Sequence, residues 1–311
     1  MTEKTFDVTV VGGGPAGLSA ALVLGRMRRE VLLLDTGAPA NAVSDAMHGF
    51  LAQDGVPPAE VRRVAAAQLD PYPTVERRAA AAVAARRHGA GFEVELEGGA
   101  PARSRRLLLA HGMSYGLPPL DGVAELWGEA VFHCPYCHGW EVRDRPVAVY
   151  ASGARAVHQA LLLRSLSDRI VLLAAGTELT AEERRLLAGA GIEVAADAVR
   201  RVAPARGGLR VEFATGRDDL ELEALFVQPE LALATGLAAS LGAAVAETAV
   251  EADAAGATSV PGLYVAGDAG AAVQSVAVAT GSGARAAYAL NADLAVEDAR
   301  RRAERKESND V

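Results

Sequence analysis

The sequence predicts an α/β fold with two doubly wound, three-layer domains. Three observations support this prediction. An apolar run at 6–11 enters a glycine-rich turn and then a helical stretch, and strand, turn and helix follow in the same order after residue 146. This order is typical of Rossmann-like dinucleotide-binding units, and its repetition predicts two of them. The third observation is that both cysteines of the chain lie between these units, so its sulfur chemistry is concentrated there.

The first turn carries the glycines that a nucleotide site needs. Gly12, Gly14 and Gly17 fit the spacing G-x-G-x-x-G, with Pro15 and Ala16 between the last two. The first glycine allows a tight turn, the second lets the backbone approach a pyrophosphate, and the third lets helix and strand pack closely. Free N–H groups at the start of the helix favour the anion. Strand, glycines and helix together favour a nucleotide site over a glycine turn without a ligand.

Asp35 ends the second predicted strand, 31–34. Its carboxylate can bind ribose hydroxyls and would repel a 2′-phosphate. Beyond it we expect a loop over 36–55, an amphipathic helix over 57–69, short strands between 75 and 97 and a strand over 106–111.

The second glycine turn has lost part of this pattern. Ala151 stands where the first glycine belongs and adds a methyl group at the tight turn. After the next strand, 170–173, the sequence offers neither an acid for a ribose hydroxyl nor a base for a 2′-phosphate. We therefore expect the second fold to persist while NADPH binding is weak or absent.

The two cysteines, Cys134 and Cys137, lie in the stretch 133–140. Thiols at this spacing can close a disulfide and pass on two electrons. Followed by His138, the pair also fits a c-type haem attachment site, and zinc binding and a structural disulfide are further alternatives. Haem attachment requires export, zinc requires more ligands than the sequence places here, and structural disulfides are rare in a cytosolic chain. These considerations favour redox chemistry.

The composition limits the class of protein. Half of the 311 residues are hydrophobic and 23% are charged, as in a globular chain. The formal net charge of −8 argues against a nucleic-acid partner. No apolar run reaches the roughly 18 residues that a membrane span needs, and the polar start of the chain does not resemble a signal peptide. We therefore expect a cytoplasmic chain without a membrane partner.

The C-terminal part contains a further strand that leads into Gly267 and Asp268. Gln274, Ser275 and Val276 then open a final helix, whose charged end beyond residue 300 is expected to fray. Residues 116–120 and 225–229 are predicted to be the two crossings between the domains.

The glycine turn, the cysteine pair and the block 258–268, in this order, resemble the low-molecular-weight thioredoxin reductases over almost the whole chain. The resemblance implies a discontinuous FAD domain, 1–114 with 229–311, and an inserted NAD(P)-binding-like domain, 115–228, that carries the cysteines. His138 stands where the usual reductase pattern has an aspartate. In this respect the chain is similar to the FAD-dependent dithiol oxidases of disulfide natural products, such as those for gliotoxin and holomycin, which close a dithiol with FAD and O2.

The resemblance also implies residue roles. Cys134 would exchange with the substrate, Cys137 would face the flavin, and His138 would be the acid/base. Asp268 would bind the FAD ribityl chain, and the final helix would point its N-terminus at the flavin N1/O2 edge, where it stabilises negative charge. The positions expected to bind FAD are Gly12, Gly14, Pro15, Ala16, Gly17, Asp35, Asn41, His48, Val83, Gly112, Gly267, Asp268, Gln274, Ser275 and Val276.

These features predict an FAD-dependent dithiol oxidase that forms a disulfide in a small dithiol substrate. O2 would be the electron acceptor and H2O2 the product. One alternative is a thioredoxin reductase-like disulfide reductase that uses NAD(P)H or another donor, and a second is a non-catalytic flavin-binding redox sensor. We also expect a homodimer and no metal.

Overall fold

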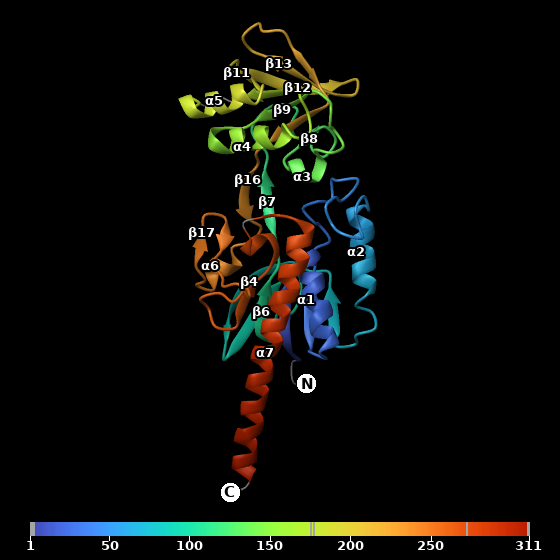
Figure 1. Cartoon of the computed structure of the whole chain (residues 1–311). Helices are drawn as coiled ribbons and strands as arrows, with labels where there is room; N and C mark the ends of the chain where they lie inside the picture. Colours follow the sequence, from blue (N-terminus) through green and yellow to red (C-terminus); the bar gives the residue numbers. More distant parts are fainter. Residues whose placement is uncertain (1–3, 175, 177, 272, 310–311) are drawn as a thin grey trace. The chain divides into compact units, whose positions relative to one another are not determined.

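The structure is a computed structural model that describes residues 4–174, 176, 178–271 and 273–309. The chain forms two compact units, each described here by itself. Unit 1 comprises Met1–Ala42, Pro58–Ser114 and Ala232–Val311, and unit 2 comprises Val43–Pro57 and Tyr115–Leu231 (Figure 1). The segment Val43–Pro57 thus groups with unit 2, whereas the predicted domain boundary keeps it in the first domain.

Unit 1 is built on a mixed sheet with strand order β3-β2-β1-β6-β5-β4, in which β19 also pairs with β6. The pairs β3–β2, β2–β1, β1–β6 and β6–β19 are parallel, whereas β5 pairs antiparallel with both β6 and β4. The bounds are β1 Thr5–Val11, β2 Val31–Leu34, β3 Val75–Arg78, β4 Ala82–His88, β5 Gly91–Leu96, β6 Ala102–Leu109 and β19 Leu263–Val265.

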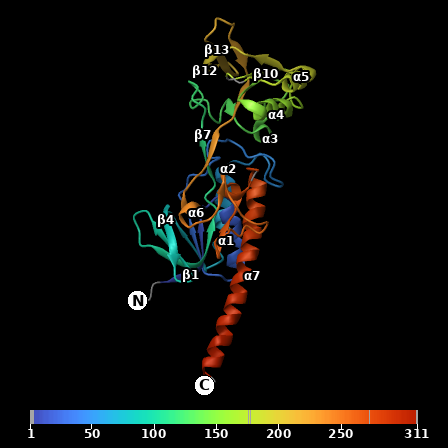
Figure 2. The same ribbon diagram turned by 90° about the vertical axis from the view of Figure 1, so that its left-hand side faces the viewer.

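The core of unit 1 lies on both faces of this sheet because successive side chains point to opposite faces. Val10 packs in one cluster with residues of α1 and α7, and the next residue, Val11, packs in the other cluster. Figures 1 and 2 show α1 and α7 side by side along the sheet. The helical bounds in unit 1 are α1 Pro15–Arg26, α2 Pro58–Ala67, α6 Leu237–Ser240, the 3-10 helix η1 Gly267–Gly270 and α7 Val276–Asn309, and the hairpin strands are β17 Val245–Ala246 and β18 Ala249–Val250.

Unit 2 repeats the architecture with a parallel sheet of order β11-β10-β9-β15-β8 and a separate antiparallel sheet, β12-β13-β14. The bounds are β8 Val131–Phe132, α3 Pro135–His138, β9 Val147–Tyr150, α4 Gly153–Leu163, β10 Ile170–Leu173, α5 Ala181–Gly189, β11 Glu193–Ala195, β12 Val199–Ala205, β13 Gly208–Phe213, β14 Leu220–Leu222 and β15 Ala224–Val227. Where the chain passes between the units, β7 (Met113–Gly116) pairs with β16 (Glu230–Leu233).

The predicted fold class, two Rossmann-like domains, is confirmed by these sheets. Two local predictions are wrong. The run 225–227 is not a crossing but part of β15, a fully buried strand inside the second sheet, and β16 makes the crossing instead. The charged tail does not fray at residue 300, because a run of good helix formers continues α7 to Asn309.

Candidate functional site

The first glycine turn joins β1 to α1 in unit 1. Gly12 has a φ of +112°, and a Cβ there would overlap the carbonyl oxygen of Ala110. A Cβ on Gly17 would overlap the carbonyl oxygen of Gly12. A Cβ on Gly14 would meet nothing within 4 Å. The protein's own packing therefore requires glycine at 12 and 17, whereas the space beside Gly14 is open to a ligand.

The start of α1 offers free backbone donors. Gly14 is the N-cap and has no side chain to cap the helix, Pro15 occupies the first turn, and this turn contains no acidic residue. The N–H groups of the first turn of a helix have no partner within the helix and carry the positive end of its dipole. This turn is therefore suited to an anion such as a pyrophosphate.

Asp35 follows β2 and lies against the glycine turn, where a Cβ on Gly13 would overlap its carboxyl group. Its carboxylate accepts hydrogen bonds from the backbone N–H of Gly37, at 2.9 Å, and from the guanidinium of Arg62 on α2. The Nε of Arg62 also donates to the Gly13 carbonyl at 3.4 Å. Arg62, which contacts Asp35, was not predicted from the sequence, because nothing in the helix pattern distinguishes it from Arg63, the other arginine of α2.

Asp268 lies in η1, the short helix that follows β19. Its Oδ1 is buried and has no hydrogen-bond partner among the described residues. Burial raises the pKa of this carboxyl from its ordinary 3.8 to about 6. A buried acceptor without a donor is costly, so the site fits a ligand that donates a hydrogen bond here, as a ribityl hydroxyl does.

The backbone around Asp268 is held by α7. The N–H of Gly267, whose φ is +72°, donates to Ser282 Oγ at 2.8 Å. Ser275 caps α7, because its Oγ accepts from the N–H of Val278 at 3.1 Å. Gln274 Nε2 donates to the Ala271 carbonyl at 3.2 Å. The predicted helix start at residues 274–276 is therefore present, and the predicted contact of these residues with a flavin stays a prediction.

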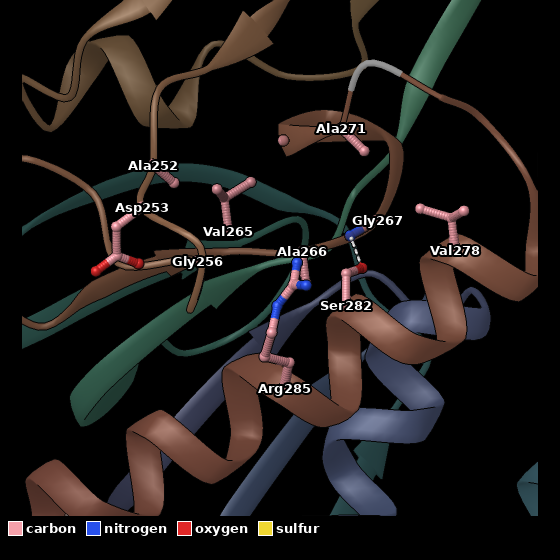
Figure 3. Close-up of a pocket in the computed structure, with 11 residues that line it drawn as sticks. Ala252, Asp253, Gly256, Val265, Ala266, Gly267, Ala271, Val278, Ser282 and Arg285 are labelled. Carbon is pink, nitrogen blue, oxygen red and sulfur yellow. Dashed lines mark hydrogen bonds between the residues drawn. The ribbon is translucent and has the colours of Figure 1, made fainter.

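A cavity of about 60 Å³ is lined by residues of the loop 252–256, of β19 and η1, and of α7 (Figure 3). Gly267 is the only predicted site residue in its wall. Figure 3 shows Ser282 bonded to Gly267 and the exposed Arg285 directed toward Ala266. The cavity therefore adjoins the predicted nucleotide site rather than forming it.

The predicted nucleotide residues of unit 1 mostly converge at one sheet edge. Each of these residues follows the end of a strand: the glycine turn follows β1, and Asp35 follows β2. Gly112 follows β6, and Gly267 follows β19. These four strands are parallel neighbours in the sheet. Ligands of doubly wound sheets bind at this carboxyl edge. Gly112 has a φ of +72° and open space around it.

Three further predicted positions are not at the end of one of these strands. Asn41 is half-buried in the loop after β2, and Val83 is 57% exposed on β4, where the β4–β5 register shifts. His48 belongs to the loop that groups with unit 2. Its Nε2 lies 3.4 Å from Glu141 Oε1 and its Nδ1 lies 3.6 Å from Asp54 Oδ1.

The redox turn is a short helix, α3, that begins after Cys134. Cys134 and Cys137 are joined by a disulfide. Cys134 is the N-cap of α3, and its carbonyl accepts from the N–H groups of Cys137 at 3.1 Å and His138 at 3.2 Å. Pro135 at the first helical position supports this turn because its fixed φ suits a helix start. Both sulfurs are thus held in one turn that can open to a dithiol.

His138 is the last residue of α3 and directly follows Cys137 in the chain. Its ring stacks on Phe132, with centroids 4.4 Å apart and an interplanar angle of 12°. Its Nδ1 is buried and has no hydrogen-bond partner in the described part of the chain. Burial lowers the pKa of His138, Glu141 opposes this by raising it, and His48 lowers it. The imidazole is therefore neutral near pH 7 and able to accept a proton.

His133 precedes the disulfide and is packed more tightly. Its ring stacks on Trp127 at 5.6 Å, and burial together with His138 lowers its pKa to about 4. Its carbonyl accepts from Gln159 Nε2 at 2.7 Å. These contacts agree with a packing role for His133.

The second glycine turn connects β9 to α4. Ala151 is 6% exposed, and the sharp turn is made two residues later by Gly153, with a φ of +67°. Beyond β10, residue 175 of the predicted strand end lies outside the described residues. Weak NADPH binding stays a prediction.

No helix among the described residues has the length and apolarity to cross a bilayer. In the same residues no three side chains of His, Cys, Asp or Glu gather as a metal site would require.

Known proteins resemble this chain along nearly its whole length. Residues 6–283 match the family described as pyridine nucleotide-disulphide oxidoreductase. "Thioredoxin reductase tcpT" of Claviceps purpurea (strain 20.1) is 35% identical over 91% of this chain and 92% of its own. The structure titled "Crystal structure of HlmI" has a TM-score of 0.94 and 37% identity, covering 99% of this chain and 98% of that one. An oxidoreductase from Agrobacterium tumefaciens has a TM-score of 0.89 and 37% identity, covering 94% and 99%.

These matches confirm the predicted resemblance to thioredoxin reductase-like flavoproteins and identify the chain as an enzyme. The chain belongs to the pyridine nucleotide-disulphide oxidoreductase family, as a thioredoxin reductase-like oxidoreductase.

Proposed function

We propose that the protein is an FAD-dependent dithiol oxidase that closes a disulfide in a small dithiol and passes the electrons to O2, giving H2O2. The observation that carries the proposal is the Cys134–Cys137 disulfide with His138 in the same short helix, a half-buried imidazole whose pKa is lowered by burial so that it is neutral near pH 7. Dithiol oxidation requires both an exchangeable disulfide and a base, because thiols with a pKa near ~8.5 are mostly protonated at neutral pH.

The exchange steps use the residues of the redox turn alone. A substrate thiolate attacks Sγ of Cys134, the disulfide breaks, and Cys137 leaves as a thiolate. The second substrate thiolate attacks the substrate sulfur of the mixed disulfide and releases Cys134. The substrate loses two electrons and two protons, and the protein disulfide gains the electrons. His138 takes a proton from a substrate thiol, because burial lowers its pKa and keeps the imidazole neutral and able to accept.

The nucleotide residues of unit 1 fit FAD. The first turn of α1 would hold the pyrophosphate, Asp35 a ribose, and Asp268 a ribityl hydroxyl. When bound, FAD would accept the two electrons of the Cys134–Cys137 dithiol and deliver them to O2. We assign this role to 1–114 with 229–311, and the exchange to 115–228.

The alternative is a disulfide reductase that takes electrons from NAD(P)H. The name thioredoxin reductase, printed for the Claviceps purpurea relative, favours it. Two features of the sequence argue against NAD(P)H binding. Ala151 replaces the first glycine of the second turn, and after residue 173 the sequence has no acidic or basic residue placed to bind a ribose hydroxyl or a 2′-phosphate.

Anaerobic mixing with excess NADPH separates the two. A dithiol oxidase keeps its flavin band oxidised with NADPH and loses it with a small dithiol such as dithiothreitol. Rapid bleaching by NADPH, followed by reduction of thioredoxin, would refute the oxidase and support the reductase.

A further inference from the structure

Arg62 joins three segments of unit 1 beside the glycine turn. Its Nε donates to the Gly13 carbonyl at 3.4 Å, its Nη1 donates to the Gly37 carbonyl at 3.5 Å, and its Nη2 donates to the Asp35 carboxylate. Gly13 belongs to the turn after β1, Asp35 and Gly37 belong to the loop after β2, and Arg62 belongs to α2. One guanidinium therefore ties together segments that are distant along the chain.

The helix α2 directs Arg62 toward this turn. Ala65 and Ala66, three and four residues later, pack against the core cluster that contains residues of α1. Residues three and four apart lie on the same side of a helix, so Arg62 lies on the side of α2 that faces α1. The next residue, Arg63, has a side chain that is 68% exposed and pairs with Glu60 of its own helix.

The Asp35 carboxylate keeps room for a ligand. Its Oδ1 accepts from the N–H of Gly37 at 2.9 Å, and its Oδ2 accepts from Arg62. A carboxylate offers about four acceptor positions, so about two remain for the hydroxyls of a ribose. The Asp35 side chain is 32% exposed, so a ligand can reach it. Because donors from two segments already hold the carboxylate, little rotamer freedom is left to lose when a ligand binds.

We propose that Arg62 is a positioning residue that holds the Asp35 carboxylate and the Gly13–Gly14 peptide in the geometry that binds the adenosine half of FAD. The proposal rests on the FAD site of the proposed function. A peptide group is planar and trans, so fixing the Gly13 carbonyl also fixes the direction of the Gly14 N–H. Arg62 acts through these two groups and sets the affinity for the cofactor and its preference for a ribose with a free 2′-hydroxyl.

The test compares FAD with its analogue that contains 2′-deoxyadenosine. The full-length protein is loaded with either ligand, and the dissociation constant is measured from flavin fluorescence on dilution. The wild type is expected to bind FAD roughly 10–100-fold more tightly, because the analogue lacks a hydroxyl that donates to a charged acceptor. Arg62→Gln is expected to bind FAD more weakly and to bring this ratio close to about 1, because Asp35 is no longer held in place.

A second variant and two controls complete the design. Arg62→Lys keeps the charge but not the planar fork, so its ratio is expected to lie between those of the wild type and Arg62→Gln. Asp35→Asn should lower the ratio as well, and adding Arg62→Gln to it should lower the ratio no further. Arg63→Gln is the matched control, because it removes the same charge from the neighbouring position of α2, and both dissociation constants should stay at their wild-type values.

The proposal is overturned if both Arg62 variants keep the wild-type ratio, since a general loosening of the fold weakens both ligands equally. It is also overturned if Arg62→Gln binds FAD more tightly, as expected if Arg62 competed with the ribose for Asp35. An equal change in Arg63→Gln, or a wild type that does not distinguish the two ligands, would overturn it too.

The measurement involves no dithiol and no O2, so the two proposals can fail separately. A lowered ratio in Arg62→Gln without O2-dependent dithiol oxidation by the wild type would refute the proposed function and retain the role of Arg62. An unchanged ratio with normal dithiol oxidation would refute the role of Arg62 alone. A wild type that binds no FAD would refute both.

Discussion

Asp268→Asn is expected to stabilise the FAD-free protein at neutral pH. The wild-type carboxyl is buried with an unpartnered oxygen, and its pKa is raised from 3.8 to about 6. A pKa raised on folding means that the folded state binds more protons than the unfolded state between these values. The stability that the neutral carboxyl contributes is present below about pH 4 and is lost as the pH rises through about 6.

The magnitude follows from the same two values. A pKa unit corresponds to ~1.4 kcal/mol, so a rise of a little over two units is worth at most about 3 kcal/mol. Partial solvent access to Asp268 makes the observed value smaller. The asparagine carries no charge, so the stability of the variant minus that of the wild type should grow by roughly 2–3 kcal/mol between pH 4 and pH 7.

The assay is urea unfolding of the FAD-free proteins, followed by circular dichroism across this pH range. Glu95→Gln is the control, because it removes an exposed carboxylate from β5 of the same unit. It should show little pH-dependent difference from wild type. A pH-independent difference for Asp268→Asn, or a difference that shrinks as pH rises, would refute the argument that burial without a partner raises this pKa. With FAD added, Asp268→Asn should bind more weakly, since the hydroxyl loses its charged acceptor.

Three further predictions concern the glycine turn and the redox turn. Gly14→Ala should fold normally and bind FAD weakly, whereas Gly17→Ala should be destabilised by at least ~1–3 kcal/mol, because only the latter Cβ overlaps backbone; thermal unfolding and FAD titration separate these outcomes. Cys134→Ser should leave Cys137 as a thiolate and give a long-wavelength charge-transfer band without turnover, and a spectrum identical to wild type would contradict its assigned role. His138→Ala should keep FAD but slow dithiol exchange roughly 10²–10⁴-fold, and the acid limb of the wild-type pH profile should lie below pH 6.5, because burial lowers the pKa of His138.

Short-range patterns account for much of the arrangement of the predicted nucleotide residues. The glycine turn is one strand–turn–helix, and Asp35, Gly112 and Gly267 each lie within three residues of the end of a parallel strand. Since neighbouring parallel strands end at one edge, local motifs suffice to bring these residues together. The cysteine pair is likewise contained in a single turn.

The remaining site residues depend on packing between distant segments. Arg62 reaches Asp35 across 27 residues, and His48 meets Glu141 because a loop packs on unit 2. The hydrophobic periodicity of a sequence does not predict contacts between side chains that are distant along the chain. The prediction of a crossing at β15 is wrong because a short apolar run before a proline is compatible with either a strand or a linker. Only the pairing of this run between β9 and β8 identifies it as a strand.

The most direct test of the central claim is oxygen uptake and peroxide release with a small dithiol, without any nicotinamide. The account predicts one H2O2 for each dithiol oxidised, and loss of this activity in both Cys134→Ser and Cys137→Ser while FAD stays bound. Wild-type turnover in either variant would contradict the proposed path of electrons through the disulfide. Absence of oxygen uptake in the wild type, with NADPH-dependent reduction of a protein disulfide, would contradict the oxidase itself.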